Sequence, residues 1–345
     1  MKRSIGSCAI LILGIIYLAA ATNAPAQEDF YRGKTLRIIV GFAAGGGYDT
    51  FTRTVARHID KYIPGQPAVV VENMPGAGSL VAANYLYNRA KPDGLTAGVF
   101  SSGLVTQQAM DSRGVRFDAR RFRWIGSMSK GTPVCAIMAF TGLRTLEDVM
   151  SSKKELKIGS TGPGTTTHDL TNLMITLMDA PFKVISGYGG TSDVRLAMQR
   201  REIDGACWTW ESMRTTARAM LDANGEDRLI PFVIQGRYDD PLVKELPQFT
   251  DAIKDKDKLA AFKAWLVPYE FFRPMAFPPN TPNERIDALR AALRKTMEDP
   301  AFLADAKKSK LDVEYTSGEA IEKAVEEVLD LPPKAEQLLA SAIGR

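Results

Sequence analysis

The chain has 345 residues, of which 45% are hydrophobic and 24% are charged, and its formal net charge at pH 7 is +4. A chain of this length and apolar content can bury a sizeable core and is expected to divide into two domains. The near-neutral charge argues against a nucleic-acid-binding protein, and two histidines without a thiol cluster argue against a metal site.

The first 26 residues have the pattern of a secretory signal peptide. Lys2 and Arg3 precede an apolar run from Cys8 to Ala21, and small residues follow up to Ala26. A membrane anchor is the alternative, but the apolar run is shorter than the roughly 20 residues that span a bilayer. We therefore expect cleavage after Ala26 and export of a mature chain whose formal charge is +2, because two lysine and arginine residues are removed.

Near the start of the mature chain, an apolar run leads into three consecutive glycines. Residues Ile38–Phe42 predict a buried strand, Gly45, Gly46 and Gly47 a loop of bare backbone, and Phe51–Tyr62 an amphipathic helix. Such a loop can bind an anion because unpaired N–H groups and the positive end of the helix dipole meet there. The loop lacks the lysine of a P-loop and the spacing of a dinucleotide fingerprint. Phosphate, carboxylate and a turn without a ligand stay open at this point.

Strands and helices then alternate along the chain, which predicts parallel or mixed sheets covered by helices on both faces. A second glycine loop, STGPGTTTH, opens a helix in the middle of this pattern and predicts a second site of the same kind. The predicted strands are 69–72, 96–100, 156–160, 183–186 and 203–208. Predicted helices begin at 79, 145 and 192, and the helix that follows the second glycine loop is predicted to end at 178.

The C-terminal part lacks a sheet of its own and is expected to pack on the first domain. Its pattern predicts a helix at Asn283–Glu298 and a short strand at Asp312–Tyr315. Thr316 and Glu319 predict a capping box before a last helix that ends at Asp330.

Two cysteines, Cys135 and Cys207, remain after cleavage of the signal peptide. An exported protein meets an oxidising compartment, where two cysteines can pair. Both lie in apolar segments, so two buried free thiols are the alternative, and the sequence leaves both states open.

Several of these segments resemble the solute receptors of tripartite tricarboxylate transporters, the Bug-type periplasmic binding proteins. The resemblance lies in RIIVGFAAGGGYDTFTR (37–53), in VVVENMPGAGSLVAA (69–83) with its V-E-N-x-P-G-A-G signature, and in KPDG (91–94). It covers essentially the whole mature chain. In the second domain the chain departs from the family at GPGTTTH, GYGG and CWTWES, where Thr165 replaces a serine and the usual lysine and Asp-Pro-rich segment are missing.

The resemblance implies an α/β fold of the two-lobed periplasmic binding protein kind (type II-like), with two parallel or mixed sheets flanked by helices and joined by a two-stranded hinge. We expect residues 27–127 and 238–345 to form a discontinuous first lobe and residues 128–237 the second. The long apolar segments 122–140 and 228–236 are the candidates for the two hinge crossings.

The function that the resemblance implies is a receptor in the periplasm that captures an organic carboxylic acid between its lobes and delivers it to the integral-membrane permease subunits of the transporter. We expect a monomer that is not an enzyme, has no catalytic residue, no cofactor and no metal, and binds no nucleic acid. The sequence identifies neither the acid, the affinity nor the permease.

The site residues carried over from the family lie at the two glycine loops, where backbone N–H groups and waters hold the carboxylate. Threonine hydroxyls add donors without a metal. Asp49 would repel an acid, and a favourable charge in the first turn of the helix is its alternative role. The expected ligand-binding residues are Phe42, Ala43, Ala44, Gly45, Gly46, Gly47, Asp49, Ser101, Ser102, Thr161, Thr165, Thr166, Tyr188, Gly189 and Trp208.

Two other function classes are alternatives to the receptor. An exported α/β hydrolase-like enzyme acting on a small carboxylate would need a G-x-S-x-G elbow, and no such run occurs, so Ser101 and Ser102 are interpreted as hydrogen-bonding residues. A purely structural protein would bind no small molecule.

Aromatic residues at or beside the predicted loops favour a ligand with an apolar body, such as an aromatic or longer-chain acid. Packing of the tryptophans in the core is the alternative. These residues are Phe42, Tyr48, Tyr188, Trp208 and Trp210.

Overall fold

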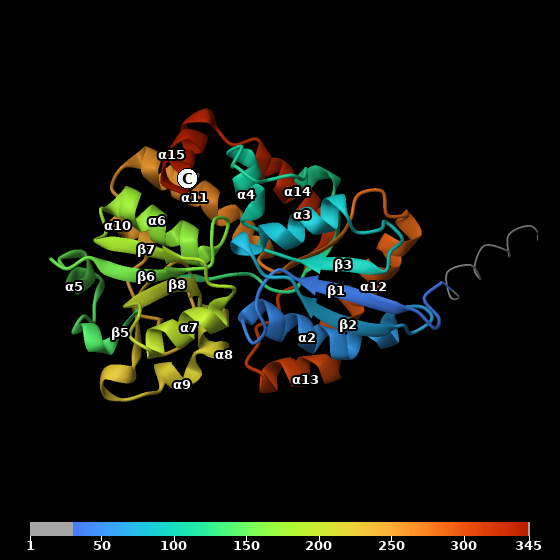
Figure 1. The fold of residues 1–345 in the computed structure, drawn as a ribbon, viewed down its shortest axis with the longest axis horizontal. Helices are drawn as coiled ribbons and strands as arrows, with labels where there is room; N and C mark the ends of the chain where they lie inside the picture. Colours follow the sequence, from blue (N-terminus) through green and yellow to red (C-terminus); the bar gives the residue numbers. More distant parts are fainter. Residues whose placement is uncertain (1–29, 344–345) are drawn as a thin grey trace, which may run out of the picture.

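A computed structural model of the chain describes residues 30–343, which form two α/β lobes lying side by side (Figure 1). The predicted signal peptide and its cleavage site fall outside the described residues. Among the helices of residues 30–343, none combines the length and the apolar character needed to cross a bilayer.

The first lobe is built on a sheet of six strands in the order β11-β4-β10-β3-β1-β2. β1 (Thr35–Val40) pairs in parallel with β2 (Ala68–Asn73) and β3 (Thr96–Val99). β10 (Pro274–Phe277) runs antiparallel to β3 and to β4 (Arg123–Ser127). β11 (Thr316–Ser317) pairs with the outer side of β4. A strand from the C-terminal part therefore completes the sheet that the N-terminal part begins.

The second lobe is built on a sheet of five strands in the order β7-β6-β8-β5-β9. β6 (Leu156–Ser160) is parallel to β7 (Phe182–Ser186) and β8 (Gly205–Thr209). β5 (Pro133–Met138) is antiparallel to β8 and to the edge strand β9 (Leu229–Ile234). The two mixed sheets confirm the predicted α/β fold class.

Helices cover both faces of each sheet, as the alternating pattern predicts. The predicted stripe in α2 is the clearest case, because Phe51, Val55 and Ile59 are almost completely buried in the main core. Around the first sheet lie α2 (Gly47–Ile59), α3 (Leu80–Asn88), α4 (Leu104–Ala109), α12 (Asn283–Glu298), α13 (Pro300–Lys308) and α14 (Gly318–Leu329). Around the second lie α5 (Leu146–Met150), α6 (Thr166–Met178), α7 (Thr191–Gln199), α8 (Trp210–Thr216), α9 (Arg218–Leu221), α10 (Phe249–Ala252), α11 (Lys256–Leu266) and α15 (Pro333–Ile343).

The chain crosses from one sheet to the other in two segments that pair with each other. The first crossing joins β4 to β5, within the apolar segment that the sequence predicts. The second is residues 269–273, since the Gly131 amide donates to the Tyr269 carbonyl at 2.9 Å and the Phe272 amide to the Ser129 carbonyl at 3.0 Å. The other predicted crossing, 228–236, is wrong because this run forms β9 at the sheet edge. An apolar run has the same sequence pattern in either place.

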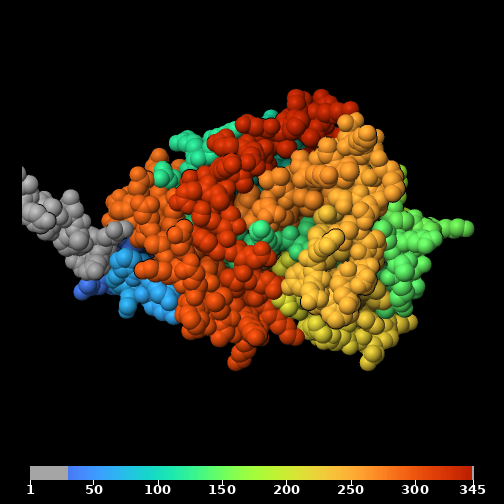
Figure 2. All heavy atoms as spheres, turned by 180° about the vertical axis from the view of Figure 1, so that it is seen from behind, coloured from blue at the N-terminus to red at the C-terminus, as the bar shows by residue number. Residues whose placement is uncertain are grey.

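The C-terminal segment reaches both lobes. Figure 2 shows the orange and red residues extending from the first lobe toward the second, where α15 packs on α6 and α11. α15 was not predicted, and the predicted strand at 312–315 is displaced to Thr316–Ser317. The residue that caps α14 is Ser317, whose hydroxyl accepts from the Ala320 amide, and not Thr316. The predicted lobe boundary near 237 conflicts with this arrangement, because α10 and α11 follow residue 237 and lie at the second sheet, whereas the boundary near 127 stays a prediction.

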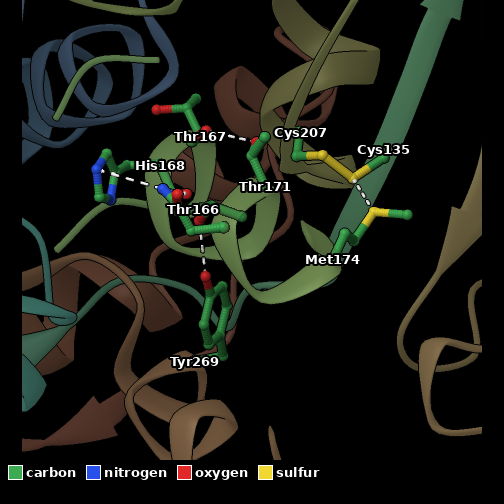
Figure 3. The surroundings of a disulfide bond; sticks show 9 residues. Cys135, Thr166, Thr167, His168, Thr171, Met174, Cys207 and Tyr269 are labelled. Atoms are coloured by element: carbon green, nitrogen blue, oxygen red, sulfur yellow. Dashed lines mark hydrogen bonds between the residues drawn. A yellow bond between two sulfur atoms is a disulfide. The ribbon is translucent and has the colours of Figure 1, made fainter. Parts of the chain in front are cut away.

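Cys135 and Cys207 form a disulfide bond, which is one of the two states that the sequence left open (Figure 3). They face each other on the antiparallel strands β5 and β8, with their Cα atoms 4.0 Å apart. The Cys135 sulfur lies 3.5 Å from the sulfur of Met174 on α6. The bond therefore links β5 to β8 next to α6, the helix that follows the second glycine loop.

Candidate functional site

A cavity of about 40 Å³ lies between the two lobes. Both glycine loops reach it, the first just before α2 and the second just before α6, and Phe272 of the second crossing contributes to its wall. None of its lining side chains carries a formal charge. They are Phe42, Gly46, Gly47, Tyr48, Ser101, Thr161, Thr165, Thr166, Thr167, Thr191, Trp208, Thr209, Ser212 and Phe272.

Four helices begin at the wall of this cavity. They are α2, α6, α7 and α8, and their N-cap residues are Gly46, Thr165, Gly190 and Thr209. None of the four caps accepts a hydrogen bond from the helix with its side chain. The first N–H groups of a helix have no partner within the helix, so an uncapped start presents donors and positive potential to its surroundings. In α8 the first amide, that of Trp210, is already bonded to the Thr132 carbonyl at 2.8 Å.

Threonine hydroxyls hold the second glycine loop in shape. The Thr165 hydroxyl donates to the Gly162 carbonyl at 2.7 Å and lies 3.0 Å from the Thr161 hydroxyl. The Thr167 hydroxyl accepts from the Thr161 amide at 2.9 Å. Because these hydroxyls bond within the loop, the Thr165 side chain is not used to cap α6, and the start of this helix stays open toward the cavity.

In α2, α6 and α7 an aspartate in the first turn holds the preceding loop. Asp49 accepts from the Gly45 amide at 2.9 Å, and Asp193 accepts from the Gly189 amide at 3.0 Å. Asp49 also accepts from Arg53 and Asn73. The Asp49 carboxylate is therefore occupied with its own loop and does not line the cavity.

Asp169 performs the same task in the second loop. It accepts from the Gly164 amide at 3.0 Å and lies 3.0 Å from Nδ1 of His168. Burial raises the pKa of Asp169, while the histidine opposes this rise. The His168 ring does not line the cavity, and the Ser101 hydroxyl donates to the Gly164 carbonyl at 2.5 Å. No nucleophile–histidine pair forms at the cavity within residues 30–343.

The lobes touch each other beside the cavity through bare backbone. The Ala43 amide donates to the Gly189 carbonyl at 2.9 Å, and the Gly78 amide donates to the Thr161 carbonyl at 3.0 Å. A Cβ atom on Gly78 would lie 2.5 Å from the Pro163 carbonyl oxygen. Glycine is therefore required here for the approach of the second lobe, and the structure shows the closed arrangement of the lobes.

The structure brings about half of the predicted site residues to the cavity wall. Those that line it are Phe42, Gly46, Gly47, Ser101, Thr161, Thr165, Thr166 and Trp208. Those that do not are Ala43, Ala44, Gly45, Asp49, Ser102, Tyr188 and Gly189. Tyr188 and Gly189 line a neighbouring hollow between the lobes, and Ala43 and Gly189 form the contact just described.

Six lining residues were not in the predicted set. Tyr48 and Thr167 directly follow predicted residues in the two loops, so the same loop pattern could have included them. Ser212 and Phe272 come from the start of α8 and from the second crossing, for which the sequence gives no ligand signal. The six are Tyr48, Thr167, Thr191, Thr209, Ser212 and Phe272.

The aromatic residues divide between the cavity and the core. Phe42, Tyr48 and Phe272 form a continuous aromatic wall, with ring centroids 4.5 Å apart for the first pair and 5.3 Å for the second. Trp208 lines the cavity from β8 and also belongs to the second core cluster. Trp210 is completely buried in the second core cluster, as the alternative interpretation holds for that residue.

Two buried charged groups lie near the cavity but do not line it. Burial lowers the pKa of Arg273 and raises the pKa of Glu211. The Glu211 carboxylate accepts from the Thr132 amide at 3.0 Å. Among residues 30–343, no group of three His, Cys, Asp or Glu side chains is placed to hold a metal ion.

Comparison with known proteins gives matches over most of the described chain. The model of the tripartite tricarboxylate transporter family receptor matches residues 51–235. A UPF0065 protein of Cupriavidus necator is 42% identical over 77 residues, which is 22% of this chain and 23% of that protein. A UPF0065 protein of Bordetella bronchiseptica is 26% identical over 165 residues, 46% of this chain and 47% of that protein. The chain thus spans about a quarter to a half of the length of these curated relatives.

Solved structures share the fold over nearly the whole chain. The periplasmic binding protein BugD superimposes with a TM-score of 0.73 at 19% identity, covering 90% of this chain and 98% of BugD. MatC of Rhodopseudomonas palustris, solved with bound malate, gives 0.69 at 18% identity, covering 89% and 99%. A second R. palustris protein, solved with adipate, gives 0.69 at 16% identity, covering 90% and 98%. These similarities establish the two-lobed periplasmic binding protein fold.

Proposed function

The chain belongs to the tripartite tricarboxylate transporter receptor family, and from this premise we propose that it is a periplasmic receptor that binds an organic carboxylic acid between its two lobes and delivers it to membrane permease subunits. We expect it to act as a monomer, after cleavage of the leader that the sequence predicts.

The observation that carries this proposal is the convergence of uncapped helix starts on one cavity. Gly47, Thr166 and Thr191 are the first residues of α2, α6 and α7, and all three line it. Helix N-termini stabilise anions through their free N–H groups and their dipoles. A carboxylate matches donors of this kind, which need no metal and no acidic partner.

The aromatic wall supports an acid with a substantial apolar body. Phe42, Tyr48 and Phe272 offer ring faces that a short, strongly hydrated dicarboxylate would not use. Related structures carry malate and adipate, so the family fold accommodates acids of different chain length. We propose that an aromatic or longer-chain carboxylic acid binds here in preference to succinate or malate.

Binding requires the lobes to open and close about the two paired crossings. Some contacts of the closed state, such as that between Ala43 and Gly189, are single backbone hydrogen bonds that can break without burying a charge. Hinge closure around a ligand is a common motion of periplasmic receptors and lets weak contacts from two lobes combine.

A thermal-shift screen of the mature protein against mono-, di- and tricarboxylates, aliphatic and aromatic, tests the proposal. We expect at least one aromatic or longer-chain acid to raise the melting temperature and to compact the protein in small-angle scattering. Calorimetry should then give at least tenfold tighter binding than for succinate, or about 1.4 kcal/mol. The absence of any stabilising acid would contradict the receptor function, and tight binding without compaction would contradict closure.

A further inference from the structure

Arg273 is a buried cation at the hinge between the lobes. Only 1% of its surface is exposed, and it lies in the second crossing immediately before β10. Its Nη1 donates to the Ser129 hydroxyl at 2.5 Å, and its backbone amide donates to the Ser127 hydroxyl at 3.2 Å. These bonds tie it to the first crossing, so its position is fixed by the hinge itself.

The guanidinium lacks a carboxylate partner within residues 30–343. Its Nε has no hydrogen-bond acceptor, and the groups around it are the rings of Tyr48, Phe51 and Phe272, whose centroids lie 5.0 to 5.5 Å from the guanidinium carbon. Glu211 attracts it across a distance greater than that of a salt bridge. Burying an arginine without a contacting counter-charge is costly, since ring faces replace only part of its hydration.

The charge lies one residue layer behind the cavity wall. Tyr48 and Phe272, which contact Arg273, both line the cavity. A Cβ atom built on Gly47 would lie 3.2 Å from Nη2 of Arg273 and 2.1 Å from the hydroxyl oxygen of Ser212. Gly47 and Ser212 also line the cavity, so the guanidinium, the start of α2 and the Ser212 side chain meet at one point of the wall.

We propose that Arg273 is a specificity-determining residue of this site, whose positive charge makes the cavity prefer a carboxylate over a neutral ligand of the same shape. This rests on the proposed function and adds to it: the helix starts supply donors, and Arg273 supplies the formal charge that they lack. The Ser212 side chain lines the cavity beside that charge, so its hydroxyl can orient its dipole toward a bound acid.

A purely structural role for Arg273 makes a different prediction. If its only task is to hold the two crossings together, its removal will weaken binding of an acid and of a neutral analogue by the same factor. If its charge selects the ligand, its removal will weaken only the acid. The ratio of the two affinities therefore separates the roles, whatever happens to overall stability.

The experiment uses the mature protein and two matched pairs of probes, benzoate with benzamide and adipate with adipamide, measured by calorimetry. In the wild-type protein we expect the better acid to bind at least tenfold more tightly than its amide. In Arg273→Gln and Arg273→Met this ratio should fall at least fivefold, with amide affinity unchanged within twofold. Arg273→Lys, which keeps the charge, should retain most of the ratio.

An unchanged ratio in the two neutral variants would overturn the inference while leaving the receptor function intact. Should neither neutral variant fold, a wild-type ratio near one or its loss in Arg273→Lys would overturn it equally. Failure of both acids to bind the wild-type protein would instead contradict the proposed function, and the inference with it.

Discussion

Four helix starts at the cavity differ from four helix starts elsewhere in the described part of this protein. At the cavity, the N-caps of α2, α6, α7 and α8 make no side-chain bond to the helix. Away from it, Thr145, Asp255, Asp299 and Ser317 cap α5, α11, α13 and α14 with their side chains. The helices α3, α4, α9, α10 and α12 also begin without a side-chain cap.

This difference separates helix starts whose backbone N–H groups are used for stability from helix starts whose N–H groups stay available to a ligand. A side-chain cap satisfies orphan N–H groups and contributes about 1 kcal/mol to stability. Leaving several helices uncapped around one cavity gives up that stability, and the donors remain available to an anion. Substitutions at matched positions in the two regions should therefore have opposite signatures.

The largest expected effect is at the first residue of α2. In Gly47→Ala the added methyl group would overlap the Ser212 side chain, so the closed state cannot form and ligand affinity should fall at least a hundredfold, about 2.7 kcal/mol. The matched variant is Gly318→Ala at the start of α14, where a Cβ would meet the Trp124 carbonyl at 2.2 Å. It should lower the melting temperature and leave the dissociation constant, measured by calorimetry, unchanged. Normal ligand binding by Gly47→Ala would contradict the expected difference between the start of α2 and the start of α14.

A tenfold effect is expected from the two tryptophans around the start of α8. Trp208→Leu removes a lining ring, so the preference for an aromatic acid over succinate should largely disappear, a change of about 1.4 kcal/mol. Trp210→Leu, in the core cluster behind it, should lower stability and keep the preference. Circular dichroism verifies folding of both variants, and loss of the preference in both would refute the division between wall and core.

An effect near 1 kcal/mol should separate two threonine N-caps. Thr145→Ala breaks the capping box of α5 and should lower the free energy of unfolding by about 1 kcal/mol in urea titrations, without changing ligand affinity. The Thr209 hydroxyl is buried without a partner in the described structure, so Thr209→Ala should change stability by less than about 0.5 kcal/mol. It should still weaken ligand binding several-fold, and a stability loss equal to that of Thr145→Ala would contradict its uncapped role.

The smallest expected effect concerns pH. Amides of Lys258 and Asp257 lower the pKa of the capping carboxyl of Asp255, so its stabilisation is present above the unfolded pKa and is lost as pH falls through the folded one. Burial raises the pKa of Asp169 beside the cavity, so its ionisation destabilises the fold as pH rises above the unfolded pKa.

Melting temperatures measured between about pH 6 and about pH 3.5, around the carboxyl range, test these signs. Asp255→Asn should lessen the loss of stability on acidification, whereas Asp169→Asn should make that loss steeper because the opposing contribution is gone. Equal slopes of melting temperature against pH in both variants would show that the two carboxyl groups do not differ in the sign of their contribution to stability.

The sequence predicts the fold well where local pattern and burial agree. The sequence predicts strand 156–160 and helix 283–298 at the bounds that the structure gives, because the residues with alternating or helical apolar spacing are the residues that form the buried face. The second crossing was misplaced since β9 and residues 269–273 are both apolar and only tertiary pairing distinguishes them. α15 escaped prediction because its partners, α6 and α11, are distant in sequence.

For the site, the sequence predicts the loops better than the wall. Glycines and threonines are visible in sequence because bare backbone and short hydroxyl side chains are unusual in such runs. Ala43 and Gly189 were predicted as ligand residues but meet each other, since the same bare backbone also serves lobe contact. Phe272 and Arg273 lie in the second crossing and Ser212 at the start of α8, and no local pattern encodes their approach to the site.

A recognition surface made from main-chain amides has an evolutionary consequence. Every residue type except proline supplies the same N–H group, so mutations among the lining threonines and aromatics can reshape the cavity while the affinity for acids persists. Duplicated genes of such a receptor can then change the acid that they bind in small steps while each step stays functional. This follows because side chains set the shape of the cavity, whereas main-chain N–H groups set its affinity for an anion. Diversification of ligand within one fold becomes the expected history of a protein built this way.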